Sequence, residues 1–191
     1  MGKNNLKEIH ILRWDEIPDF PLYIDQVVSL IEQSLSFLSL SEDDKIITST
    51  MINNYVKHGI VEPPVKKKYT RVHVAYFMVV CLMKKVYSLD EISKLIRIQI
   101  AAIPTDRAYD TFCEAFELSL TGINDEQAET HVDDNYIIDL FYKVVDSVVY
   151  KIYVQNELYE EITFEQEKKA LEEKEKKEKK EKKKEKKQEN E

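Results

Sequence analysis

Short polar and basic side chains gather between Thr48 and Arg71, and their chemistry suits contact with nucleic acid. Hydroxyl and amide groups can donate hydrogen bonds to phosphate, and asparagine can pair with adenine in the major groove. Lysine and arginine neutralise phosphates and give binding a strong salt dependence. The candidate DNA-binding residues are Thr48, Ser49, Thr50, Asn53, Asn54, Lys57, Lys66, Lys67, Lys68, Tyr69 and Arg71.

The first part of this set falls on a predicted short helix that runs to about His58. Thr48 or Ser49 can cap its start, and Gly59 suits the position after its end, where a positive φ is needed. Its inner face is predicted to be Met51, Ile52, Tyr55 and Val56. The outer face could be an ordinary solvated surface, but two successive asparagines are poor helix formers and favour a role in binding.

The second part lies in a basic loop. Pro63-Pro64 excludes helix there, and Val65–Tyr69 could form a short strand or ribbon that carries three successive lysines. Such a ribbon would contact the phosphates beside the groove that the helix enters, which supplies affinity and register but does not read sequence. The alternative is an ordinary solvated loop.

The charge distribution supports a local interface. The whole chain has a net charge of -8, yet residues 57–97 carry nine basic and three acidic side chains. The flanking stretches 1–56 and 98–164 are both acidic. Because charges more than about 10 Å apart are largely screened at ordinary salt, the local positive charge matters more than the total.

Helical periodicity and few glycines or prolines predict an all-α fold. A first helix of about sixteen residues follows Pro21. Further helices are predicted at Arg71–Tyr87, at Leu89–Ile98 with a Ser88–Glu91 capping box, and from Thr105 as the capping residue to about Leu120, where Gly122 ends the helix.

A long final helix is predicted to begin within residues 124–134. Two neighbouring apolar stripes run along it, one containing Ile137 and Val144 and the other Ile138 and Val145. Two stripes exceed the apolar width of a surface helix, so this helix is either buried on two sides or packs against a partner subunit. We expect a homodimer through residues 131–160. From Glu165 the chain is a Lys/Glu tail, predicted to be a disordered solubilising segment or a solvated single helix.

Patterns typical of enzymes and cofactor sites are missing. The four histidines show no metal-ligand spacing, no glycine-rich phosphate loop occurs, and Cys81 and Cys113 lie within apolar helical patterns. We therefore expect no catalytic activity, no cofactor and no metal. The sequence contains no apolar run long enough to span a membrane and no signal peptide, so we expect a cytoplasmic protein that contacts no membrane.

Two resemblances add to this interpretation. The order TxxxxxNYxKxGIVxPPxxKxY followed by YSLDEISKLI resembles the DNA-binding domain of MerR-type regulators over about fifty residues. The matching positions are Tyr55, Gly59, Ile60, Pro63, Tyr69, Arg71, Ser88, Leu89, Glu91 and Ile92. This implies a recognition helix followed by a wing. The chain differs at Asn53-Asn54, where those regulators usually have arginine, so phosphate affinity is better supported than base reading.

The second resemblance is to the bacterial domain-of-unknown-function 1836 family, over roughly residues 14–155. It is carried by LYIDQVVSLIEQ, TSTMINNYVKHGIVEPPVKKKYTRVHVAY and SLDEI. It supports the fold and implies no particular chemistry.

These observations predict an all-α fold with a MerR-like winged helix-turn-helix module and a helical C-terminal half. The expected division is a lead-in at 1–20 with Trp14 as an anchor, the module at 21–103, a dimerisation or regulatory part at 104–164 and the tail at 165–191. The expected function is transcriptional regulation by binding double-stranded DNA. The alternatives are a protein-interaction module that keeps the helix-turn-helix scaffold, and a sensor with a pocket among the aromatic residues of the C-terminal half. Those aromatics are Tyr109, Phe112, Phe116, Tyr136, Phe141 and Tyr142.

Overall fold

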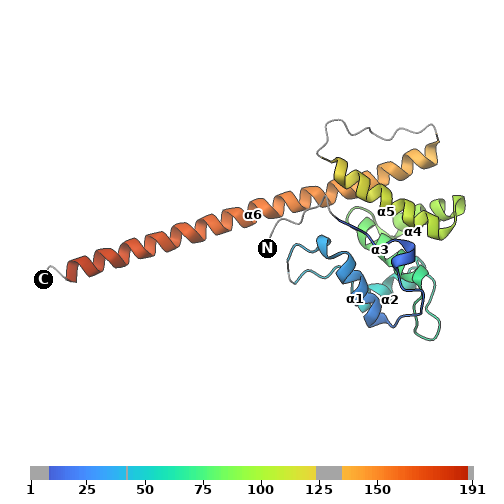
Figure 1. The fold of residues 1–191 in the computed structure, drawn as a ribbon, viewed down its shortest axis with the longest axis horizontal. Helices are drawn as coiled ribbons and strands as arrows, with labels where there is room; N and C mark the ends of the chain where they lie inside the picture. Colours follow the sequence, from blue (N-terminus) through green and yellow to red (C-terminus); the bar gives the residue numbers. More distant parts are fainter. Residues whose placement is uncertain (1–8, 42, 124–134, 189–191) are drawn as a thin grey trace. The chain divides into compact units, whose positions relative to one another are not determined.

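The computed structural model describes residues 9–41, 43–123 and 135–188, with side chains described as far as residue 171. Over these residues the fold is all-α, without a β-strand, as predicted (Figure 1). The helices are α1 (Ile24–Ser34), α2 (Ser49–Lys57), α3 (Arg71–Met83), α4 (Leu89–Ala102), α5 (Thr105–Gly122) and α6 (Tyr136–Gln188), with short 3₁₀ helices at Trp14–Glu16 and Ser36–Leu38. The chain divides into two units, Met1–Tyr153 and Val154–Glu191. None of the described helices is long and apolar enough to cross a membrane.

Helix α3 forms the centre of the first unit and contacts α1, α4 and α5. Nine of its thirteen residues are buried, and they face all sides of the helix. A helix that is apolar all round must be enclosed by other elements, because no single face could be left to solvent. Val74, Phe77 and Met78, for example, are completely buried. The other elements are therefore positioned by how they pack on α3.

Three predicted capping features are confirmed. The Thr48 hydroxyl accepts a hydrogen bond from the Met51 N–H at 3.2 Å and caps α2. Gly59 follows α2 with a φ of 66°, the left-handed conformation that glycine adopts without strain. The predicted capping box of α4 is present, with the Ser88 N–H donating to Glu91 Oε2 at 2.8 Å.

Other boundaries differ from the prediction. Helix α3 ends at Met83, and the residues to Tyr87 form turns bonded to the Met83 and Leu82 carbonyls. Helix α4 runs on to Ala102, because the first strong stop is Pro104 and the residue before a proline is driven to extended backbone. Thr105 is the first residue of α5 rather than its cap, which is Pro104.

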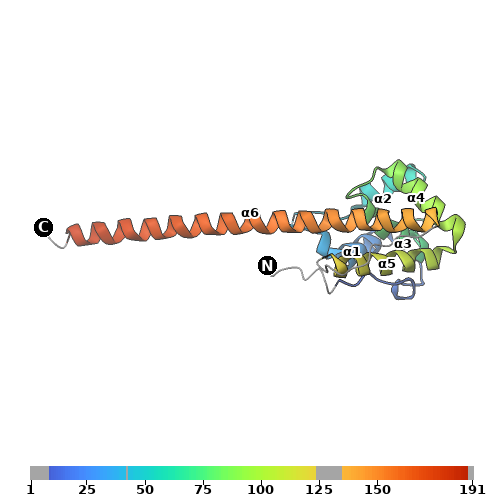
Figure 2. The same ribbon diagram turned by 90° about the horizontal axis from the view of Figure 1, so that it is seen from above.

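The two stripes of α6 are both used inside the chain. Val144, Val145, Val148, Val149 and Ile152 are buried. Helix α6 lies beside α5 (Figures 1 and 2), where the Ser119 hydroxyl donates to Asp146 Oδ1 at 2.7 Å. This part of the helix is thus covered on two sides, as one of the two sequence-based alternatives proposed. The predicted start within residues 124–134 lies outside the described residues.

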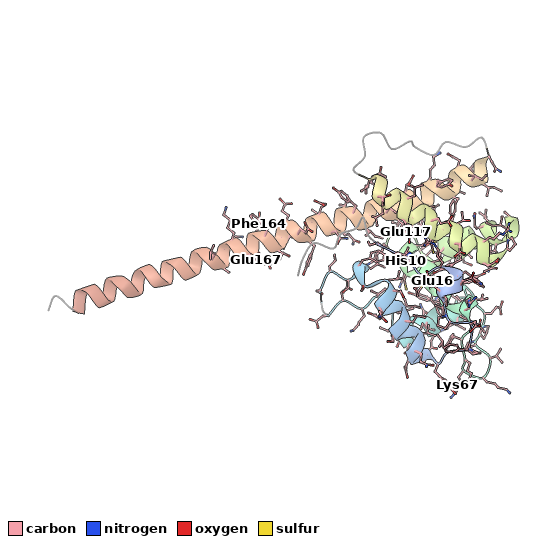
Figure 3. The ribbon with its side chains drawn as sticks, in the orientation of Figure 1. His10, Glu16, Lys67, Glu117, Phe164 and Glu167 are labelled. Atoms are coloured by element: carbon pink, nitrogen blue, oxygen red, sulfur yellow. The ribbon has the colours of Figure 1, made fainter. Side chains whose placement is uncertain are left out.

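Residues 11–16 form a strap that is hydrogen-bonded along α5. Glu117 accepts from the Ile11 N–H at 2.7 Å and pairs with the Arg13 guanidinium through both carboxylate oxygens. Asp110 accepts from the Trp14 N–H at 2.7 Å. Figure 3 shows Glu117 close to His10 and Glu16, and His10 Nε2 lies within hydrogen-bonding distance of Glu16 Oε2, at 2.7 Å. The strap lowers the pKa of Glu117, because Arg13 and the Ile11 N–H stabilise its charged form despite partial burial.

The start of α3 depends on a neutral histidine. His73 occupies the third helical position, where a capping box usually has Glu or Gln, and its Nδ1 accepts from the Thr70 N–H at 3.0 Å. Its side chain is buried, and burial lowers its pKa below the usual 6.5. Backbone groups of Glu62 and Pro63 act in the opposite direction but do not outweigh burial.

We predict that the free energy of unfolding falls as the pH drops below about 6.5, because the unfolded chain then takes up a proton on His73 before the folded chain does. His73→Gln keeps an acceptor for the Thr70 N–H and should remove this part of the pH dependence. The measurement is urea denaturation at a series of pH values from 7.5 down to about 5. His58→Gln, at an exposed position, is the control, and an equal loss of pH dependence in both variants would contradict the assignment.

Candidate nucleic-acid interface

One face of α2 presents the polar side chains that the sequence singled out. Thr50, Asn53, Asn54 and Lys57 are all exposed, and their spacing places them on the same side of the helix. On the opposite side Ile52 and Tyr55 are completely buried. The exposed face carries no acidic and no large apolar group, so a phosphate or a base edge could approach it without repulsion.

The first two candidate residues lie at the N-terminal end of this face. Thr48 and Ser49 are half-buried. The Thr48 hydroxyl is already used as an acceptor for the Met51 N–H. Its role is therefore to define where α2 begins, and its O–H group can still donate a hydrogen bond to another partner.

The lysine triplet forms a tight turn, which we call the basic turn (residues 65–68). The Lys68 N–H donates to the Val65 carbonyl at 3.0 Å, and Lys66 and Lys67 have φ values of 51° and 61°. Positive φ at both central residues is the pattern of a type I′ turn, which normally has Asn-Gly there. The expected strand is reduced to two isolated antiparallel bridges, Val65 with Lys68 and Tyr69 with Leu22, because two residues in the left-handed region reverse the chain at once. All four side chains are exposed, and Figure 3 shows Lys67 at the tip of its loop.

Helix α2 and the basic turn are held by the same residue of α3. The Tyr55 ring from α2 lies 6.3 Å from the Phe77 ring, and the Tyr69 ring lies 5.9 Å from it, measured between centroids. Leu22 and Tyr69 exchange two backbone hydrogen bonds of 2.8 Å, which fix the base of the turn. Both elements are thus positioned against Phe77, which is completely buried.

Two of the candidate residues do not lie on the exposed surface. Tyr69 is 4% exposed, so its ring belongs to the core. The Arg71 side chain is mostly covered, lies 3.4 Å from Asp15 Oδ1 and stacks 5.9 Å from the Trp14 ring. The side chains of Tyr69 and Arg71 are therefore packed beneath the basic turn and stabilise it.

One basic residue near α2 was not among the sequence-based candidates. Lys84, just after α3, is exposed and places its Nζ 5.5 Å from the Tyr55 ring centroid. It adds a positive charge beside α2. The sequence showed that Lys84 belongs to the basic stretch 57–97. Only the packing of α2 on α3 shows that Lys84 lies close to α2.

The structure offers little for covalent or metal chemistry. Burial raises the pKa of both Cys81 and Cys113 to about 12, so these thiols are protonated at neutral pH and are poor nucleophiles. Among the residues that the structure describes, no group of three or more His, Cys, Asp and Glu side chains could hold a metal ion.

We predict that Lys66→Asn/Lys67→Gly stabilises the protein by about 1 kcal/mol or more, because L-residues other than Asn are strained in the left-handed region. The measurement is the free energy of unfolding in urea. Lys66→Gln/Lys67→Gln removes the same charges and keeps the strain, so it serves as the control. If the free energy of unfolding rises equally in both variants, the cause is relief of charge repulsion and not relief of backbone strain.

The comparisons with known proteins give a family and no function. The pattern of the family described as "Domain of unknown function (DUF1836)" matches residues 12–112, which include most of the strap, α1 to α4, the basic turn and the first eight residues of α5. Neither the curated proteins nor the solved structures contain a match. The match covers more than half of the chain, and the protein belongs to the domain of unknown function 1836 family.

Proposed function

We propose that this protein is a cytoplasmic, non-catalytic transcriptional regulator that binds double-stranded DNA in the manner of a MerR-like winged helix-turn-helix protein. The proposal rests on one observation: α2, with its polar face, and the basic turn are both packed against Phe77. The polar face of α2 would enter the major groove, and the basic turn would act as a minimal wing on the flanking phosphates.

The proposed DNA contacts fall into phosphate contacts, base contacts and indirect, positioning roles. Lys57, Lys66, Lys67, Lys68 and Lys84 are exposed and would neutralise phosphates. Asn53 and Asn54 would supply whatever base reading occurs, since their amides can pair with adenine. Thr48, Tyr69 and Arg71 would act indirectly, by positioning the helix and the turn. The strain at Lys66 and Lys67 supports a binding role, because strained backbone tends to persist where function requires it.

We predict that the full chain binds genomic DNA fragments with an affinity that falls steeply as salt rises. Lys66→Ala/Lys67→Ala/Lys68→Ala should lower the slope of log K against log salt by about 2 to 3, since each phosphate contact contributes roughly 0.9. Fluorescence anisotropy with labelled fragments at several salt concentrations measures this. Lys151→Ala/Lys168→Ala/Lys169→Ala removes three exposed lysines from α6 and is the matched control.

Several results would count against DNA binding. These are no binding at low salt, equal affinity of the wild type and the basic-turn variant, or equal losses in the basic-turn and control variants. Pull-down from cell extract with and without nuclease separates the alternative of a protein-interaction module, because partners bridged by DNA disappear after digestion. Asn53→Ala/Asn54→Ala should weaken binding to preferred sites more than to unrelated DNA.

We further propose that two copies associate through α6, so that a two-fold dimer presents two α2 helices to a pseudo-palindromic site. The apolar residues from Val144 to Ile152 are already buried in the chain's own core. Exposed apolar residues remain on both sides of this buried segment, and we assign the contact to those that follow it, at the C-terminal end of the expected range 131–160 and in the next turn of α6. Val154, Leu158 and Ile162 follow at intervals of four on one side of α6 and are 48%, 54% and 56% exposed.

We predict that Leu158→Glu converts a dimer into a monomer, because a buried unpaired carboxylate at an apolar helix contact is strongly unfavourable. Sedimentation equilibrium of the full chain measures the mass. Phe164→Glu makes the same change at an exposed apolar residue on another side of α6 and should leave the dimer intact. A wild-type monomer, or a dimer unaffected by Leu158→Glu, would refute this contact.

A further inference from the structure

An apolar pocket lies within the first unit, lined by residues of α3, α4, α5 and the first turns of α6. Its volume is about 80 Å³. The inner wall comes from α3 and α5 and includes Ala75, Met83, Ala108 and Phe112, all of them buried. Protein interiors are normally packed as densely as organic crystals, so a hollow of this size at the centre of four helices is a departure that costs stability.

The pocket opens to solvent through a rim of isoleucines. Ile98 and Ile100 from α4 and Ile137 from α6 line it and are 41%, 37% and 40% exposed. Large aliphatic side chains held at the mouth of a hollow keep apolar surface in contact with water, which is unfavourable unless something covers it.

The lining defines the chemistry of an occupant. Among the described residues, no Asp, Glu, Lys, Arg or His contributes to the lining, so a charged molecule would lose its hydration there without compensation. Four lining residues have polar side-chain groups, Tyr76, Gln99, Thr105 and Tyr109, of which the Tyr109 hydroxyl is bonded to Leu12 and Met78. Hydrophobic walls with a few polar groups are typical of small-molecule sites. The pocket's volume of about 80 Å³ is roughly half that of an engineered apolar cavity of about 150 Å³ that binds benzene, and the open mouth lets an occupant extend beyond it.

One wall of the pocket is held rigidly in place. Tyr109 lines it, and its hydroxyl donates to the Leu12 carbonyl at 2.6 Å and lies 3.0 Å from Met78 Sδ. The Tyr109 ring also meets the Trp14 ring edge-on, with 6.4 Å between centroids. These contacts fix the ring from behind, so an occupant would not have to order it, and the conformational cost of binding would be small.

We propose that this pocket is a binding site for an uncharged small molecule of about the size of a substituted benzene ring, with a single hydrogen-bonding group directed to Gln99 or Thr105. The site is separate from α2 and the basic turn, so the proposal stands whether or not the protein binds DNA. It lies among aromatic residues that the sequence marked for a sensor, namely Tyr109, Phe112 and Phe141.

The first test uses the full chain and two probes of similar shape, benzyl alcohol and benzoate. Methyl resonances of Met83 and Ala108 report on the pocket by nuclear magnetic resonance. We expect benzyl alcohol to shift them saturably and benzoate, which is charged at neutral pH, to bind at least about tenfold more weakly. Absence of saturable binding, or equal binding of the two probes, would overturn the proposal.

The second test fills the pocket. Val79, a lining residue on α3, is changed to Phe, and Val72→Phe makes the same change at an exposed position of α3 outside the pocket. Val79→Phe should weaken benzyl alcohol binding by at least about tenfold and Val72→Phe by less than about twofold. Equal effects would refute the site. A second copy of the chain is the competing occupant, and sedimentation of both variants tests for it. A dimer lost only in Val79→Phe would show that a second copy covers this pocket and would refute the proposal.

Discussion

The contact of Phe77 with Tyr55 and Tyr69 is the interaction on which the proposed surface depends. Phe77 lies on a helix that is buried on all sides, so its position is set by the whole core. The two tyrosines approach it from elements that are separate in sequence, α2 and the residue after the basic turn. Aromatic pairs of this kind combine large buried area with a preferred geometry. They orient α2 and the basic turn against one rigid residue, although neither has a sheet to support it.

A second set of contacts runs along the strap at residues 11–16. Glu117 and Asp110 of α5 accept its backbone N–H groups, and Arg13 closes the pair with Glu117. At its end, Trp14 contacts both Tyr109 on α5 and Arg71 at the start of α3. The strap thereby connects the acidic helical half with the residues behind the basic turn. Its Ile11 and Trp14 N–H groups bond to carboxylate side chains of α5, because a segment outside a sheet has no neighbouring strand to bond.

Local chemistry was a good guide to the helices and a poor guide to the turn. Thr48, Gly59, Ser88 and Glu91 mark helix ends through bonds within a few residues, so their roles follow from type and spacing. The exposed face of α2 followed in the same way from the apolar residues opposite it. The expected ribbon at Val65–Tyr69 was not found, since nothing in the sequence signals that two lysines adopt positive φ. Tyr69 and Arg71 looked like surface residues beside lysines, but distant partners, Phe77 and Asp15, determine their positions.

By itself, the sequence determined that this protein is all-α, where most of its helices begin, and that its positive charge is local. Those properties depend on residue propensities, capping groups and composition, all of which are readable over short distances along the chain. Only the tertiary structure decided that α6 uses both apolar stripes inside the chain from Val144 to Ile152, and that Lys84 lies beside α2. It alone also showed the pocket at the meeting of four helices. These features come from contacts between residues far apart in sequence, where burial and shape complementarity, and not local preference, select the arrangement.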